Sequence, residues 1–106
     1  MPSPRFGEVW HAPSGSVLPG GMLCLIVSSD DYNRIRRQYI IVEVVTDPLS
    51  GDAIICPLGP GIGVALTGTP FAVGPNWFDG TDEPIAILDE PAARRAADQV
   101  RAILGP

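Results

Sequence analysis

Two apolar runs separated by a polar connector constrain this chain more than any other feature. Leu23 to Val27 is continuously apolar, and Tyr39 to Val45 is a second run, rich in β-branched residues, that Asp47-Pro48 ends. These runs predict two strands, the first of them buried on both faces. Ser28 to Gln38, the connector, is too long for a tight hairpin, so we expect its ends to pair while its middle presents side chains. The core positions expected from these strands are Leu23, Leu25, Val27, Ile40, Val42 and Val44.

Further short strands are expected along the rest of the chain. Twelve Gly and twelve Pro favour many short elements over long helices. The expected strands cover residues 5–11, 53–56, 62–66, 69–73 and 84–88, and the expected loops cover 12–21, 48–52, 59–61 and 74–83. The last strand should lie at a sheet edge, because Pro84 has no backbone donor.

A single helix is expected at the C-terminal end. Asp89 or Glu90 caps it, Pro91 suits its first turn, and it runs to about Leu104, where Gly105 stops it. Its apolar stripe consists of Ala93, Ala96, Ala97, Val100, Ile103 and Leu104. Short strands followed by one helix predict a mainly β fold, a small antiparallel barrel with a C-terminal α-helix, formed as one domain over residues 1–106.

Composition excludes several classes of protein. A hydrophobic content of 45% in 106 residues argues for one ordered domain with a modest core. No apolar run is long enough to cross a bilayer and no signal peptide is evident, so we expect a cytoplasmic protein. Cys24 and Cys56 lie in apolar runs without metal-ligand spacing, so we expect buried free thiols, no metal site and no cofactor.

The charge distribution is uneven. The net charge is −5 and the chain has no lysine, which gives no long-range attraction for nucleic acid. However, three of the seven arginines, Arg34, Arg36 and Arg37, lie close together in the connector. A local basic patch is therefore expected there.

Two motifs resemble the MazF/PemK family of toxins from toxin–antitoxin systems. The opening run from Arg5 to Trp10 is similar to that family's first strand, and the Ser29-Asp30-x-x-Asn33-Arg34 motif lies between strands ending in Val-Ser and Val-Thr. The likeness covers the first half of the chain well and the second half loosely. It implies an SH3-like antiparallel barrel of the MazF/CcdB kind and a homodimer. It also implies metal-independent, sequence-specific cleavage of single-stranded RNA, and a MazE-like antitoxin that blocks the site.

The resemblance also implies where RNA cleavage would occur. Attack of the ribose 2′-hydroxyl on phosphorus needs an acid and hydrogen-bond donors for the phosphate. The family uses an arginine at the start of the second strand and a threonine at the end of the third. Thr46 matches the threonine, or else simply closes a strand, but Met22 occupies the arginine's position. Arg36 and Arg37 are candidate catalytic substitutes, or ordinary solvated charges.

Three connector residues are candidates for binding RNA: Tyr32, Asn33 and Arg34. An aromatic ring can stack on a base while a guanidinium holds phosphate, although Tyr32 could instead pack over the barrel edge. His11, the only histidine, is a further catalytic candidate because histidine titrates near neutral pH. The family pattern does not call for it, and the alternative is a structural or exposed histidine.

Two alternative functions stay open at this point. The first is a CcdB-like toxin that binds DNA gyrase and cleaves nothing, which the missing arginine favours and the Asn33-to-Thr46 pattern does not. The second is a catalytically degenerate MazF-fold protein that acts through interactions alone.

Overall fold

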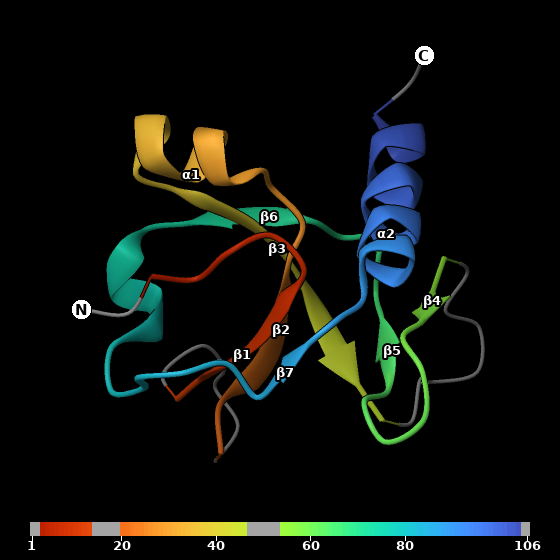
Figure 1. Cartoon of the computed structure of the whole chain (residues 1–106), viewed down its shortest axis with the longest axis horizontal. Coiled ribbons are helices and arrows are strands. Elements are labelled where there is room, and N and C mark those ends of the chain that lie inside the picture. The colour runs from red at the N-terminus through yellow and green to blue at the C-terminus, as the bar shows by residue number, and fades with distance from the viewer. Residues whose placement is uncertain (1–2, 14–19, 47–53, 105–106) are drawn as a thin grey trace.

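The structure, a computed structural model, describes residues 3–13, 20–46 and 54–104. Its elements are β1 (Glu8–Ala12), β2 (Met22–Ile26), α1 (Asp30–Arg36), β3 (Tyr39–Val45), β4 (Cys56–Pro57), β5 (Val64–Ala65), β6 (Phe71–Val73), the 3-10 helix η1 (Pro75–Phe78), β7 (Ala86–Ile87) and α2 (Glu90–Ile103). The strands pair in an antiparallel manner, so the mainly β prediction is confirmed (Figure 1).

Strand β3 is the hub of the sheet. The strand order is β4-β5-β3-β2-β1-β7, and β6 pairs with the first part of β3. Val44 of β3 pairs with Leu23 of β2 on one side and with Ala65 of β5 on the other. The path begins at β4 and ends at β7, and among the described residues these two strands do not pair. The expected barrel is therefore an open half-barrel, with β7 at an edge as predicted.

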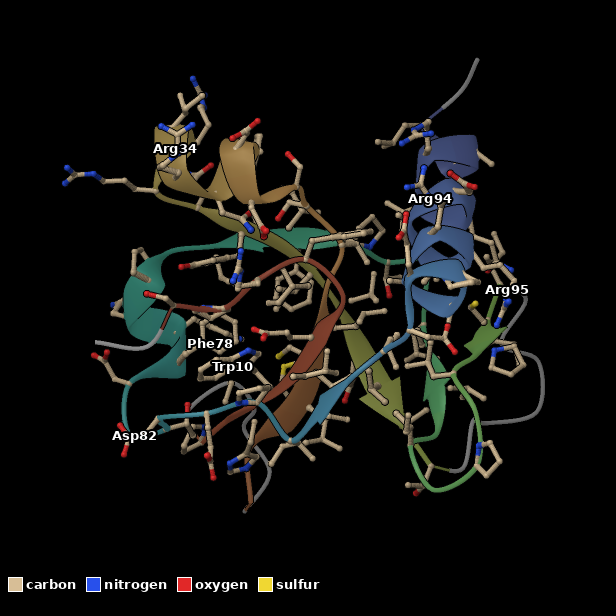
Figure 2. The ribbon with its side chains drawn as sticks, viewed as in Figure 1. Trp10, Arg34, Phe78, Asp82, Arg94 and Arg95 are labelled. Carbon is tan, nitrogen blue, oxygen red and sulfur yellow. The ribbon has the colours of Figure 1, made fainter. Side chains whose placement is uncertain are left out.

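Both faces of the central strands are covered. Leu25, Val42 and Val44 are buried beneath α2 on one face. Cys24 and Ile41 are buried on the other face with a cluster that includes Trp10 and Phe78, whose ring centroids lie 5.9 Å apart (Figure 2). Three of the six expected core residues are thus fully buried, whereas Leu23, Val27 and Ile40 are half-buried at the margin.

The connector forms a helix, which corrects the prediction of a loop and of a single helix in the chain. Ser29 Oγ caps α1 by accepting the Tyr32 N–H at 3.1 Å, and Asp30 and Asp31 favour its first turn. Arg37 ends the helix in the left-handed region at φ 51°. A helix this short carries no long apolar stripe, so hydrophobic periodicity does not indicate it, and the local signals for it are the Ser29 cap and the acidic residues Asp30 and Asp31.

Helix α2 is confirmed with Asp89 as its cap, since the Asp89 carboxylate accepts the Ala92 N–H at 2.8 Å. Its apolar stripe is shorter than predicted, because Leu104 is 76% exposed and Ile103 39% exposed beyond the end of the sheet. The predicted loop 48–52 and Gly105 lie outside the described residues, as does most of loop 12–21. No helix in the described part of the chain is long and apolar enough to cross a membrane.

Leu25 provides a test of the core. Leu25→Ala should lower the free energy of unfolding by about 2–5 kcal/mol, because it leaves a cavity between β2, β3 and α2. Ile87→Ala, at a side chain 71% exposed, should change it by less than about 0.5 kcal/mol. Urea denaturation measures both, and a Leu25→Ala cost as small as that of Ile87→Ala would contradict this description of the core.

The buried thiols make the free energy of unfolding depend on pH in the alkaline range. Burial, assisted by the nearby Glu43 carboxylate, raises the pKa of Cys24 from 9.0 to about 11, and burial also raises the pKa of Cys56 and Tyr39. The unfolded chain therefore loses these protons at lower pH than the folded chain. The contribution of Cys24 to the free energy of unfolding is fully present below about pH 9 and is lost as the pH rises toward about 11. This contribution is about 2–3 kcal/mol.

Unfolding measured from pH 8 to pH 11 tests this expectation. Wild-type stability should fall over this range, and Cys24→Ala should fall less steeply because its core position no longer titrates. Identical pH profiles for the two proteins would show that Cys24 does not titrate as its burial requires.

Candidate functional site

Thr46 directly follows β3 and borders an open hollow of about 450 Å³. The other residues that line this hollow are Pro57, Gly59, Gly61, Gly63 and Val64. Gly63 has φ +119°, and a Cβ there would lie 2.5 Å from the Val45 carbonyl oxygen, so only glycine allows this close approach. The hollow thus offers a hydroxyl and accessible backbone, and none of the residues named as its lining carries a charge.

His11 lies at the same end of the sheet. It pairs with Leu23, which pairs with Val44, so the three residues form one row across β1, β2 and β3. Two strand spacings place His11 about 10 Å from β3. Its Nε2 donates a hydrogen bond to the Gly20 carbonyl oxygen, because a carbonyl can only accept. Nδ1 is then the ring nitrogen left to exchange a proton.

Met22 begins β2 beside the end of β3, where the family resemblance implies an arginine. It pairs with Ala12 and packs against the cluster that contains Trp10 and Phe78. No lysine or arginine is among the described residues that line the Thr46 hollow. The polar side chains described at this end are Thr46 and His11, and they lie beside accessible backbone groups.

Arg36 and Arg37 are not brought to Thr46 within one chain. They lie at the end of α1, beside the beginning of β3, whereas Thr46 follows the end of β3 (Figure 1). A strand of seven residues separates its two ends by roughly 20 Å. Within one chain, Arg36 and Arg37 therefore lie too far from Thr46 to act beside it in place of an arginine at position 22.

Asn33 points into the protein and is buried. Ser28 Oγ donates to Asn33 Oδ1 at 2.5 Å and accepts the Ile40 N–H at 2.9 Å, and Asn33 Nδ2 donates to the Ser28 carbonyl at 3.4 Å. This polar lock, Ser28, Asn33 and Ile40, ties α1 to the end of β2 and the beginning of β3. In this arrangement the side chain of Asn33 is engaged by Ser28 within the fold.

The other residues of the connector motif also attach α1. The Asp30 carboxylate accepts the Phe6 N–H at 2.8 Å and lies 3.6 Å from Arg5 Nε. Tyr32 is half-buried and its hydroxyl donates to Gln38 Oε1, while exposed Arg34 pairs with Asp31. No group of three or more potential metal ligands occurs within the described residues.

Substitution of Asn33 tests whether the connector motif stabilises the fold. Asn33→Ala should cost about 1–3 kcal/mol of stability, because buried Ser28 Oγ loses its acceptor. Arg34→Ala should cost less than about 0.5 kcal/mol, because its ion pair is solvent-exposed. Urea denaturation of both variants checks this, and equal stability of the two would argue against the lock.

Comparisons with known proteins agree at the level of fold. No protein-family model and no curated protein matches the sequence. A MazE–MazF structure from Deinococcus radiodurans matches with a TM-score of 0.76 and 18% identity, covering 99% of this chain and 98% of that chain. MazF alone from the same organism matches with a TM-score of 0.74 and 18% identity, covering 100% of both chains.

A third similar structure comes from a mycobacterial species. It is an endoribonuclease in complex with its cognate antitoxin, and it matches with a TM-score of 0.73 and 18% identity over 99% of this chain and 96% of that chain. These matches extend over the second half of the chain, where the sequence motifs were weak. The chain therefore has the MazF fold.

Proposed function

We propose that the chain is a MazF-like toxin, a homodimeric and cytoplasmic endoribonuclease that cleaves single-stranded RNA without a metal and is inhibited by a MazE-like antitoxin. The observation that supports this most is the full-length match to MazF structures, together with Thr46 at the end of β3. Among the similar proteins, one is an endoribonuclease with its antitoxin and others are MazE–MazF complexes. Because these similar structures are MazF proteins, they favour the endoribonuclease function over the gyrase-binding function of a CcdB-like toxin.

In the proposed reaction, the phosphate lies in the hollow beside Thr46. The ribose 2′-hydroxyl attacks phosphorus and gives its proton to a water molecule, the bond from phosphorus to the 5′-oxygen breaks, and a 2′,3′-cyclic phosphate forms. The Thr46 hydroxyl donates to a non-bridging phosphate oxygen, and the glycines leave backbone groups accessible beside it. His11, protonated at Nδ1, donates the proton that the leaving 5′-oxygen requires.

A second candidate function follows from the position of Met22. Without an arginine there, one donor for the developing phosphate charge is missing, and losing such a donor typically costs about 10²–10³ in rate. As far as the structure describes its lining, the Thr46 hollow contains no replacement cation. A MazF-fold protein that acts by binding alone is therefore the alternative, and the two differ in whether RNA is cut.

Cleavage of RNA in the presence of a chelator tests the proposal. Wild type should cut slowly, and Thr46→Ala and His11→Ala should each lower the rate further. Met22→Arg should raise it about a hundredfold by restoring one phosphate donor. Met22→Gln is the matched control, because it adds a polar group of similar length without a positive charge and should change little.

Two results would contradict the proposal. If neither wild type nor a folded Met22→Arg variant cuts any RNA, the binding-only function replaces the enzyme. If cleavage occurs but Thr46→Ala leaves its rate unchanged, the site lies elsewhere in the chain. A melting temperature for each variant confirms that it is folded.

A further inference from the structure

The hairpin that joins β4 to β5, residues 58–63, borders the Thr46 hollow, and three of its glycines belong to the lining. The Leu58 N–H donates to the Gly63 carbonyl at 2.9 Å, which closes the hairpin where the two strands end. Strand β5 continues from the hairpin into an antiparallel ladder with the last part of β3 (Figure 1). The hairpin is therefore held beside the end of β3, next to Thr46.

The tip of this hairpin is a type II turn. The Ile62 N–H donates to the Gly59 carbonyl at 3.3 Å, and Gly61 has φ +79°. Because the Pro60 ring fixes φ near −65°, Pro60 and Gly61 have the φ values of the two central residues of a type II turn. The one hydrogen bond of such a turn uses the N–H of its fourth residue, here Ile62. The N–H of its third residue, Gly61, is not used by the turn.

The Gly61 N–H is also not engaged elsewhere. Among the hydrogen bonds that the structure describes, none has this N–H as its donor. A Cβ built on Gly61 would meet no atom within 4 Å, so the space beside the residue is open. Pro60 has no N–H, and that of Ile62 is used within the turn. Gly61 thus contributes the donor at the tip of the hairpin that a ligand can reach.

A neutral hollow makes such a donor important. As far as the structure describes its lining, no charged side chain borders the Thr46 hollow. A phosphate there is therefore held by hydrogen bonds from neutral groups, of which the Thr46 hydroxyl is one. Backbone N–H groups in turns form anion-binding sites in many proteins. Because a turn fixes its N–H groups in advance, they stabilise developing charge without a cost of reorientation.

We propose that the Gly61 N–H is a second hydrogen-bond donor to the scissile phosphate, acting beside the Thr46 hydroxyl. This deepens the proposed function and rests on it. The two donors bind the two non-bridging oxygens, on which negative charge increases as the 2′-hydroxyl attacks phosphorus. The backbone then supplies part of the stabilisation that an arginine at position 22 would give, where this chain has Met22.

A second hollow, of about 400 Å³, is the other place that offers donors to a phosphate, because Arg5 and Arg34 border it. Tyr39 borders it too, so it lies at the beginning of β3. However, Arg5 Nε lies 3.6 Å from the Asp30 carboxylate, which also borders the hollow, and Arg34 pairs with Asp31 at 3.1 Å. These carboxylates repel a phosphate, whereas none is among the described lining residues at the other end of β3.

Replacing Gly61 with glycolic acid tests the proposal, because the resulting ester lacks the N–H and keeps the conformational freedom of glycine. The full-length chain is made by ligating synthetic residues 56–106 to residues 1–55 at Cys56. The Gly61 ester should cleave RNA about a hundredfold more slowly, which is the typical cost of losing one such donor. Its melting temperature should stay unchanged, because the deleted N–H makes no described bond within the chain.

Gly80 provides the matched control. It is the third residue of another type II turn, in which the Thr81 N–H donates to the Phe78 carbonyl at 3.2 Å. Asp79 has φ −57° and ψ 136°, and Gly80 has φ +94°. Gly80 lies beside Pro13 and is not among the described residues that line the Thr46 hollow. An ester at Gly80 should therefore leave the cleavage rate unchanged.

Sulfur substitution in the RNA separates a direct contact from a structural effect. Sulfur accepts hydrogen bonds weakly, so a phosphorothioate of either configuration at the cleaved bond should slow the wild type. In the Gly61 ester the slowing by one configuration should disappear, and in Thr46→Ala the slowing by the other should disappear. If the Gly61 ester cleaves RNA as fast as the wild type, or retains both sulfur effects, the inference is wrong.

Binding of inorganic phosphate tests the site without any cleavage. In a chain with isotope-labelled glycine, the NMR resonance of the Gly61 N–H should shift in a saturable manner as phosphate is added, whereas that of Gly80 should not. Thr46→Ala should weaken this binding. An inactive wild type would refute the endoribonuclease while a saturable Gly61 shift still supports the phosphate site. A Gly61 resonance that does not shift would overturn the inference, and shifts around Arg34 instead would place the phosphate in the second hollow.

Discussion

The burial of β2 and β3 between two layers is the constraint on which the rest of this molecule depends. Leu25 and Val42 face α2, while Cys24 and Ile41 face the layer that contains Trp10 and Phe78. A strand with both faces covered cannot shift its register without exposing a full set of apolar side chains. The ends of β3 are therefore fixed in space, and these ends are where α1 and Thr46 are attached.

The motif that carries the family resemblance builds the fold more than it builds a reaction site. Ser29 caps α1, the Asp30 carboxylate holds the Phe6 N–H, and Asn33 is buried against Ser28. Each of these contacts satisfies a backbone or side-chain group that the turn from β2 into β3 would otherwise leave unpaired. A chain can thus use this motif for its architecture, whichever residue occupies position 22.

The sequence predicted those elements whose pattern is local. Tyr39 to Val45 is a strand with the expected bounds, and Asp89 caps α2, because apolar alternation and a capping side chain act within a few residues. Helix α1 was missed, because its stability comes from the lock to Ile40 and from the attachment to Phe6. Such contacts connect residues distant in sequence, which no periodicity reports.

The position of Thr46 could be predicted from the sequence more directly than its distance from the connector arginines. The position of Thr46 at the end of a strand followed from the apolar run before it. Arg36 and Arg37 were grouped with it because they are near in sequence, although the seven-residue strand between them already implies a separation of roughly 20 Å. The length of the strand between two candidate residues thus indicates how far apart they lie.

That separation divides the molecule into two chemically different ends. The arginines lie on α1 or directly after it, on α2, where Arg95 is beside Cys56, and in the N-terminal segment that Asp30 holds. By contrast, the described residues that line the Thr46 hollow carry no charge, and His11 lies at the same end of the sheet. In an acidic protein without lysine, cations placed away from the Thr46 hollow do little for a phosphate there, because exposed charges act over about 10 Å in physiological salt. The two ends of the rigid strand β3 therefore differ in the side chains that they present.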